Sequence, residues 1–220
     1  MKNLTLIIPA KNEADSLPKV LEEIKNYDCK VIIILESTDV NTISAVQNFK
    51  CQLIYQSGKG YGNALIEGMN NVETEYLCIF NADGSFDPKY LSKMLDLCKN
   101  KDFVFASRYM KEAGSDDDTI ITAIGNFIFS TIGNIFFSLK LSDILYTFLL
   151  GKTDSFKKLN LKSKDFCLCV EMPIKAKRQG MYFVDTPSYE RKRIAGQKKV
   201  NEFMDGFKIL IYMIKSFFKI

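Results

Sequence analysis

The first half of the chain alternates short apolar runs with segments of helical periodicity. Runs rich in β-branched or aromatic residues predict buried strands at residues 4–8, 31–35, 52–55, 76–80 and 103–106. Between them, residues 13–26 carry leucine and isoleucine at helical spacing, and residues 88–99 follow Asp87, an expected N-cap, with a proline at the first helical position. This alternation predicts an α/β fold in which helices cover a mostly parallel sheet.

The second half of the chain has a less regular pattern. Residues 165–179 and 203–218 show helical periodicity, and residues 181–184 are typical of a strand. In the last helix, one apolar stripe runs beside a stripe that carries Lys208, Lys215 and Lys219. Since 220 residues with 47% hydrophobic content suffice for one sizeable core, we expect a single domain with a seam near Gly114.

Residues 119–139 include no charged residue, which is long enough to raise the question of a membrane span. Polar residues recur there at every fourth position, however, and draw a stripe down one side of any helix: Thr122, Asn126, Ser130, Asn134 and Ser138. The stripe favours a helix that lies in a membrane interface or packs in the core over one that crosses a bilayer. The opening nine residues are too short for a signal peptide, so export is not expected.

The composition excludes several classes of catalytic site, metal site and partner. The chain contains no histidine, which excludes a histidine-based triad and a typical histidine-containing zinc site, so any metal must bind oxygen ligands. The six cysteines are scattered and fit a reduced cytosolic protein. The net charge of +4 is modest, and basic residues gather near the end of the sequence, which favours a local basic surface and no nucleic-acid partner.

Polar clusters follow the predicted strands at residues 9–13, 36–39 and 81–85, where the carboxyl ends of parallel strands bring ligand-binding loops together. The third strand leads into a glycine-rich turn, 58–62, which suits either a phosphate or a flexible turn before a helix. The carboxylate of Asp83 would meet a divalent cation on a diphosphate, or would simply be a turn aspartate.

The order of these clusters resembles the family 2 glycosyltransferases of GT-A fold, and among them the polyprenyl-phosphate (dolichol-phosphate) sugar transferases. The matching residues are Ile7, Ile8, Pro9, Ala10, Asn12 and Glu13; then Gly58 to Ala64; Asn81, Ala82 and Asp83; Ser107, Arg108 and Tyr109; and Pro187, Tyr189, Arg193, Gly196 and Lys199, followed by Asp205 and Gly206. The resemblance covers roughly residues 4–210 and implies a GT-A fold, Rossmann-like, with a mixed, mostly parallel sheet.

The resemblance also implies the roles of individual residues. Those expected to bind the nucleotide sugar are Pro9, Ala10, Glu13, Glu36, Asp39, Lys59, Gly60, Asn81 and Ala82. The expected catalytic residues are Asp83, Arg108 and Arg193, with Asp83 holding Mg or Mn, and the acceptor phosphate is assigned to Arg108, Arg193 and Lys199. Arginine forks suit a reaction between two phosphorylated substrates. Residues 1–113 would form the nucleotide-sugar-binding half and residues 114–220 the acceptor-side half.

The chain departs from the family pattern in three places. Lys11 replaces an aromatic residue, and the paired aspartates after the second strand appear as Glu36 to Asp39, so either of these two takes the nucleoside role. Asn81 stands where the family has its first metal carboxylate, and an amide oxygen brings no charge to a cation. A non-catalytic nucleotide-sugar-binding subunit therefore remains an alternative.

The resemblance predicts transfer of a sugar from a UDP- or GDP-linked donor to a polyprenyl phosphate by inverting displacement. A phosphate is ionised at neutral pH and needs no general base. The alternative acceptor is a growing glycan or another molecule. Residues 119–139 and 203–218 predict association with the cytoplasmic face of a membrane. The chain would be held there either by a separate membrane-protein partner or by peripheral binding to the membrane surface alone.

Overall fold

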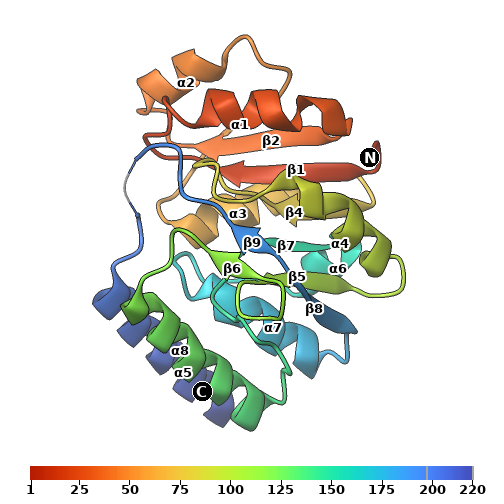
Figure 1. Cartoon of the computed structure of the whole chain (residues 1–220), viewed down its shortest axis with the longest axis vertical. Helices are drawn as coiled ribbons and strands as arrows, with labels where there is room; N and C mark the ends of the chain where they lie inside the picture. The colour runs from red at the N-terminus through yellow and green to blue at the C-terminus, as the bar shows by residue number, and fades with distance from the viewer. Residues whose placement is uncertain (197, 220) are drawn as a thin grey trace.

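The core of the molecule is a mixed β-sheet with helices on both faces (Figure 1). The computed structural model describes residues 1–196 and 198–219. Within them, the sheet has the order β3-β2-β1-β4-β7-β5-β8. Its strands are β1 (Leu4–Pro9), β2 (Lys30–Leu35), β3 (Gln52–Tyr55), β4 (Tyr76–Ile79), β5 (Phe103–Ser107), β7 (Leu149–Lys152) and β8 (Phe183–Pro187). A separate parallel ribbon pairs β6 (Gly114–Ser115) with β9 (Tyr189–Glu190).

The predicted mostly parallel sheet is confirmed, and every strand expected from the sequence is present. Strand β7 was not predicted, and it runs antiparallel to both of its neighbours, β4 and β5. It is four residues long and includes a glycine, Gly151, whose missing side chain leaves room for the ring of Phe103. The glycine and the lysine that end this segment interrupt the apolar run that marks a strand in the sequence.

Alternating side chains of the strands feed two apolar layers. On β1, Leu4, Leu6 and Ile8 pack into one layer while Ile7 packs into the other, as the two-residue period of a strand requires. Helices α1 (Leu17–Ile24), α2 (Val40–Val46) and α4 (Leu91–Cys98) belong to the first layer. Helices α3 (Tyr61–Asn70), α6 (Thr153–Lys158) and α7 (Leu168–Arg178) cover the opposite face.

The predicted helix 13–26 begins four residues later than expected. The backbone carbonyl of Glu13 accepts from the N–H of Leu17, and Ser16 turns back to bond the Glu13 carboxylate at 2.6 Å. Residues 88–99 form a 3-10 turn, η2 (Pro88–Tyr90), that continues into α4, and Asp87 caps the turn as expected by accepting from the N–H of Lys89. A second 3-10 turn, η1 (Lys25–Tyr27), follows α1.

Two long helices, α5 (Ile120–Phe137) and α8 (Glu202–Phe218), lie side by side at one end of the molecule (Figure 1). The polar stripe of α5 faces inward: Asn126 and Ser130 are buried. Asn126 donates to the carbonyl of Ser142 at 3.4 Å and accepts from the N–H of Leu145 at 3.2 Å. The stripe therefore supplies hydrogen-bond partners to an irregular backbone segment, residues 141–145.

The apolar side of α5 consequently faces outward. Its exposed large side chains are Ile120, Ile121, Ile124, Phe127, Ile128, Ile135 and Phe136, and α8 adds Phe203, Met204, Phe207, Ile214, Phe217 and Phe218. We call these thirteen residues the α5/α8 apolar surface. Helix α5 is long and apolar enough to cross a membrane by length and composition. An apolar surface of this kind marks a binding face for a protein or a lipid.

Replacing Asn126 with alanine tests the inward orientation of the stripe. The change leaves the carbonyl of Ser142 and the N–H of Leu145 without their partner, so it should lower the free energy of unfolding by about 1–3 kcal/mol. Phe127→Ala, one position away and 72% exposed, should change it by less than about 0.5 kcal/mol. Urea denaturation of both variants measures the difference. Equal losses would mean that the helix is rotated from the orientation described.

Candidate active site

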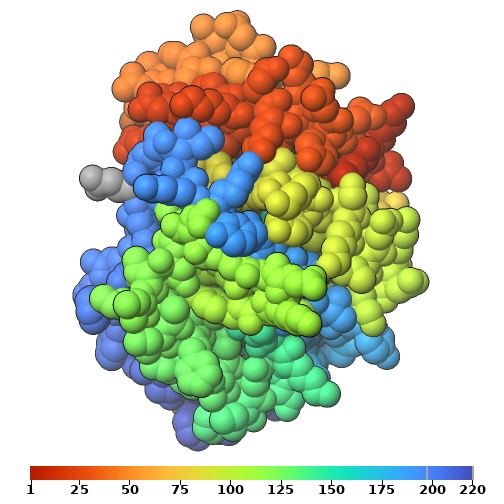
Figure 2. Space-filling view, in the orientation of Figure 1, coloured from red at the N-terminus to blue at the C-terminus, as the bar shows by residue number. Residues whose placement is uncertain are grey.

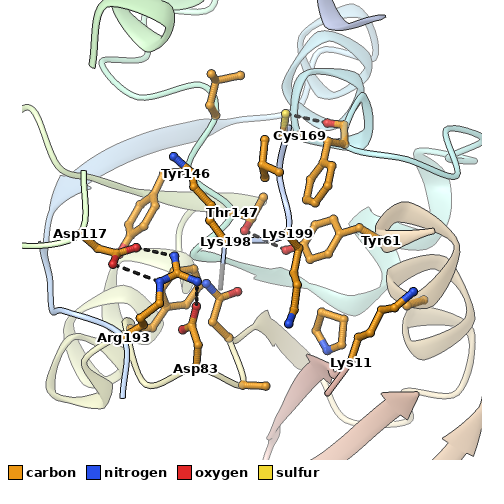
Figure 3. Close-up of a pocket in the computed structure, with 18 of the residues that line it drawn as sticks. Lys11, Tyr61, Asp83, Asp117, Tyr146, Thr147, Cys169, Arg193, Lys198 and Lys199 are labelled. Carbon is orange, nitrogen blue, oxygen red and sulfur yellow. Dashed lines mark hydrogen bonds and ion pairs between the residues drawn. The ribbon is translucent and has the colours of Figure 1, made fainter. Parts of the chain in front are cut away.

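A cavity of about 430 Å³ opens at the carboxyl ends of β1, β2 and β4 (Figure 3). Most of the residues singled out in the sequence line it: Pro9, Ala10, Glu13, Glu36, Gly60, Asn81, Ala82, Asp83, Arg108, Arg193 and Lys199. Asp39 and Lys59 are not among its lining residues. Loops that are far apart in the sequence thus meet at one sheet edge, as the strand order requires.

Asp83 lies at the centre of this edge, in the loop that follows β4. Its Oδ1 atom accepts from the backbone N–H of Ser85 at 3.0 Å and from the Ser85 hydroxyl at 2.7 Å. Its Oδ2 atom faces Nη1 of Arg193 at 3.6 Å. The same guanidinium donates from Nε and Nη2 to the two carboxylate oxygens of Asp117, at 3.1 and 2.5 Å (Figure 3). Arg193 therefore bridges two carboxylates across the cavity.

A segment that we call the strap, residues 191–196 and 198–200 between β9 and α8, carries Arg193 over the sheet edge. The N–H of Arg191 donates to the carbonyl of Ser85 at 2.9 Å, and the N–H of Ile194 donates to the carbonyl of Asp83 at 2.7 Å. Gly84 has φ +82°, and a Cβ there would lie 2.4 Å from Cδ1 of Ile194. In Figure 2 the strap forms blue atoms on the surface between the red N-terminal segment and the green middle segment.

Glu13 anchors the other end of the strap. Its carboxylate accepts from Ser16 and lies 3.5 Å from Nζ of Lys199. Burial raises the pKa of Glu13, while the Ser16 hydroxyl and the Lys199 ammonium oppose that rise. Its backbone N–H donates to the Thr42 hydroxyl at 2.9 Å. Glu13 thus lies on the cavity wall, and Lys199 is held to it at the cavity mouth.

Arg108 is largely buried and surrounded by carboxylates. Its Nε and Nη2 atoms donate to Asp143 at 2.7 and 3.0 Å, and Nη1 donates to Glu190 at 3.2 Å. Burial opposes the charge of Arg108, but Asp143 and Glu190 outweigh it and hold the pKa well above the ordinary value. Burial raises the pKa of Glu190, and Arg108 opposes that rise. The guanidinium expected to meet a phosphate is therefore already paired.

The geometry distinguishes the two acidic residues that follow β2. Asp39 caps α2: its carboxylate accepts from the N–H of Thr42 at 3.3 Å and from the N–H of Asn12 at 2.6 Å. Glu36 lines the cavity, and its Oε1 atom lies 3.1 Å from Nζ of Lys11. Glu36 therefore has the position of a ligand-binding residue, whereas Asp39 shapes the loop.

The glycine-rich turn is packed against protein backbone. A Cβ on Gly60, which has φ +107°, would lie 2.2 Å from the carbonyl oxygen of Lys164, and one on Gly62 would lie 2.3 Å from that of Ser163. The N–H of Asn63 donates to the same Lys164 oxygen at 3.1 Å. The close approach of residues 163–165 is a physical reason for glycine at these two positions. A phosphate bound at this turn stays a prediction.

The segment that presses on this turn is fixed by a buried glutamate, Glu171. Its carboxylate accepts from the N–H groups of Lys162 and Ser163 at 2.9 and 2.8 Å and pairs with Lys175 at 2.6 Å. Burial opposes the charge of Glu171, but the Lys175 ammonium and the Ser163 bonds outweigh it and lower the pKa. A side chain of α7 thus fixes the segment that packs against the glycine-rich turn.

Sequence reasoning missed several lining residues. Asp117 and Asp118 were not predicted to line it, and the signal that could have found them is the run of three aspartates, residues 116–118, just before α5. Tyr61 lines the cavity beside Thr147, to which its hydroxyl is bonded at 2.9 Å (Figure 3). These residues come from three separate segments, and a single sequence carries no signal that brings them together.

The donor set at the sheet edge fits a divalent cation in part. No group of three or more His, Cys, Asp or Glu side chains is placed to hold a metal among residues 1–196 and 198–219. Oδ2 of Asp83 nevertheless already faces a positive charge, and Asn81 lines the cavity while its amide nitrogen donates to Ser85 at 3.3 Å. One carboxylate and one amide oxygen suit a hard cation that takes its remaining ligands from a diphosphate and water.

Comparison with known sequences identifies relatives of this chain. The family model described as glycosyl transferase family 2 matches residues 5–159. The low-salt glycan biosynthesis hexosyltransferase Agl6 of Haloferax volcanii is 22% identical over 96% of this chain, which spans 53% of that relative. The undecaprenyl-phosphate mannosyltransferase of Micrococcus luteus is 25% identical over 91% of this chain and 88% of its own length.

Comparison with solved structures shows the GT-A fold. Glucosyl-3-phosphoglycerate synthase from Mycobacterium tuberculosis, in complex with Mn²⁺ and UDP-glucose, superposes with a TM-score of 0.75 at 12% identity and covers 98% of this chain and 79% of its own. Mannosyl-3-phosphoglycerate synthase from Rubrobacter xylanophilus gives a TM-score of 0.71 at 11% identity over 97% and 72%. At such identities the likeness concerns the fold alone.

Alanine at Gly62 tests the packing of the glycine turn. The new Cβ would meet backbone oxygens of Ser163 and Asp165 at 2.3 and 2.7 Å, so the variant should lose about 1–3 kcal/mol of unfolding free energy. The matched control is Gly125→Ala, also inside a helix, where nothing lies within 4 Å and stability should rise by up to about 1 kcal/mol. Thermal and urea unfolding report both changes, and a neutral Gly62→Ala would contradict the close approach.

Proposed function

The chain belongs to glycosyl transferase family 2, and on that premise we propose that it transfers a sugar from a nucleotide-sugar donor to a polyprenyl phosphate at a membrane surface. The observation that carries the proposal is the cavity that Asp83, Arg193 and Glu36 share at the carboxyl ends of the parallel strands. A polar cleft at this edge is the usual ligand site of open α/β sheets.

The donor would lie along the sheet edge, across the ends of β2, β1 and β4. Pro9, Ala10 and Glu36 line the part expected to hold the nucleoside, and Asp83 lies where the diphosphate would follow. Arg193 then meets the leaving diphosphate with a planar fork of donors. Positive charge aimed at the group on which negative charge develops is the electrostatic contribution that speeds such a transfer.

The reaction is a direct displacement at the anomeric carbon. An oxygen of the acceptor phosphate forms a bond to that carbon while its bond to the donor diphosphate breaks, which inverts the centre and releases a nucleoside diphosphate. The acceptor oxygen is already ionised, so no residue of the chain has to remove a proton from it, and the residues bind and align the two substrates. We assign the acceptor phosphate to Lys199 and Arg193, with Arg108 held behind them by Asp143 and Glu190.

A divalent cation, Mg or Mn, would be held by Asp83 with Asn81, and bound there it would neutralise the charge of the leaving diphosphate. The M. tuberculosis enzyme named above was crystallised with Mn²⁺ and UDP-glucose, which supports a cation-dependent donor site here. Before the donor binds, the charge of Asp83 is balanced by Arg193, whose ion pair at 3.6 Å is longer than its bonds to Asp117.

A lipid acceptor is supported by the α5/α8 apolar surface. Asp118 and Thr122, at the start of α5, line the cavity, so the helix that leaves its wall carries an outward apolar face. Lys215 and Lys219 lie near the end of α8, where they would meet anionic headgroups. We propose peripheral binding to the cytoplasmic face of the membrane, because spanning would expose the buried polar stripe of α5 to lipid.

One observation favours a second candidate, transfer to a hydroxyl group of a growing glycan. The far side of the cavity carries Asp117, Asp118 and Glu190 beside the two arginines, and Asp143 lies behind them. Four carboxylates against two guanidinium groups repel an acceptor phosphate unless a cation accompanies it. A carboxylate such as Asp118 would instead accept the proton of an attacking hydroxyl.

Neutralising Asp83 tests the donor site. Asp83→Asn keeps the shape of the side chain but removes its charge, so sugar transfer to polyprenyl phosphate should fall by about 100- to 1,000-fold. Released nucleoside diphosphate and labelled lipid product measure it. The matched control, Asp96→Asn, removes an exposed carboxylate that pairs with Lys99 and should keep wild-type turnover. Unchanged transfer by Asp83→Asn would contradict the proposed role.

The same assay separates the two acceptors. Polyprenyl phosphate should accept sugar, whereas polyprenol of the same chain length and a soluble oligosaccharide should not. Transfer to the oligosaccharide with none to polyprenyl phosphate would replace the first candidate with the second.

Introducing charged side chains on the α5/α8 apolar surface tests the proposed binding to a membrane. The double variant Phe127→Glu/Phe207→Glu places carboxylates on two side chains that are 72% and 66% exposed, so it should bind anionic liposomes at least about tenfold more weakly than wild type. Flotation of protein with vesicles at low salt measures it. Val40→Glu changes an exposed apolar residue on α2 and should float like wild type. A wild-type protein that stays at the bottom of the gradient would contradict membrane binding.

A further inference from the structure

The ion pair between Lys11 and Glu36 forms the outer end of the cavity. Lys11 follows β1 and Glu36 follows β2, two strands that are neighbours in the sheet, and Nζ of Lys11 lies 3.1 Å from Oε1 of Glu36. Both residues line the cavity, and the pair is separated from the Asp117 and Arg108 side by Asp83. If the diphosphate lies at Asp83 and the acceptor lies on the α5 side, the base of the donor lies against this pair.

The pair offers an ordered set of hydrogen-bonding atoms. A lysine ammonium only donates, and a carboxylate only accepts, through two oxygens. Read along the pair, the order is donor, acceptor, acceptor. The side chain of Glu36 is 29% exposed and that of Lys11 is 63% exposed, so both are accessible to a ligand at the cavity mouth while still partly shielded from water.

We propose that Lys11 and Glu36 select a guanine base, so that the donor is a GDP-linked sugar. The edge of guanine presents O6 as an acceptor, then the N1–H donor, then the N2 amino donor. This order is the complement of the pair: O6 faces the Lys11 ammonium, while N1–H and the amino group face the two oxygens of Glu36. The inference rests on the proposed function, since it takes the cavity to be the donor site.

The other bases leave part of the pair unmatched. Uracil has one N–H between two carbonyl groups, so the second oxygen of Glu36 would face a carbonyl oxygen. Adenine and cytosine present an amino group beside a ring acceptor, so each also offers Glu36 a single donor position. A buried or half-buried acceptor that meets another acceptor loses binding energy, and this loss is what gives a base pocket its selectivity.

Neighbouring polar groups do not take this role. Asp39 caps α2 and accepts from the N–H of Asn12, and the side-chain amide of Gln56 donates to the carbonyl of Gly60 at 2.8 Å. Both are committed to holding their loops. Glu36, by contrast, has Lys11 as its side-chain partner among the described residues.

Binding of nucleoside diphosphates, measured by calorimetry on the full chain with Mg²⁺, tests the assignment without any transfer reaction. GDP should bind about tenfold or more tightly than UDP and than ADP, which matches GDP in size. Inosine diphosphate keeps O6 and N1–H but lacks the amino group, so it should bind about tenfold more weakly than GDP. UDP or ADP binding as tightly as GDP would overturn the inference.

The variant Glu36→Gln distinguishes recognition from a structural role. Its amide offers one acceptor and one donor, so binding of GDP should weaken about tenfold while binding of UDP stays equal or improves, because uracil presents an N–H beside a carbonyl. Equal weakening of both nucleotides would overturn the inference. Glu73→Gln, an exposed carboxylate beside Lys30, is the matched control and should alter neither affinity.

Failure of the base assignment and failure of the proposed function give different results. If UDP binds best and a UDP-sugar supports transfer to polyprenyl phosphate, the guanine inference is wrong and the transferase stands. If none of the nucleoside diphosphates binds, the cavity is not a donor site and both proposals fall.

Discussion

The guanidinium of Arg193, shared between Asp83 and Asp117, is the interaction on which the rest of the site depends. It joins three parts of the chain that are distant in sequence: the loop after β4, the acidic turn before α5 (residues 116–118) and the strap before α8. Two carboxylates facing one cavity repel each other, and a single fork of donors between them removes that repulsion. The strap stays over the sheet edge because this fork and two backbone bonds to Asp83 and Ser85 hold it there.

The same interaction couples the cavity to the apolar surface. Helix α5 begins directly after the acidic turn and α8 begins directly after the strap, so both helices of the apolar surface start at the cavity wall. The inward polar stripe of α5 supplies hydrogen bonds to residues 141–145, and this leaves its apolar side outside. An acceptor whose tail lies in lipid would therefore present its polar end beside Arg193. The positive charge of Arg193 and the start of the α5/α8 apolar surface thus lie at the same cavity, as the proposed reaction requires.

Much of the sheet and part of the site could be predicted from the sequence. Asp83 and Glu36 follow strands whose buried residues are apolar, so a strand pattern is enough to place them at one sheet edge. The partnership of Arg193 with Asp117 spans 76 residues and depends on tertiary packing, which no local pattern encodes. The glycine-rich turn suggested either a phosphate site or a flexible turn before a helix, and the structure adds a close contact of Gly60 and Gly62 with backbone oxygens of the segment fixed by Glu171. The sequence also did not predict that α5 turns its apolar side outward, because amphipathic helices usually bury that side.

In the proposed donor complex, the charge of Asp83 marks where the diphosphate and its cation lie. A crystal structure of the protein with Mn²⁺ and a nucleoside diphosphate, recorded for the anomalous signal of manganese, tests it most directly. We expect a manganese peak within coordination distance of the Asp83 carboxylate, with the diphosphate as a further ligand and Arg193 moved from Asp83 toward the phosphates. Manganese bound away from Asp83, or a nucleotide outside the cavity, would contradict it.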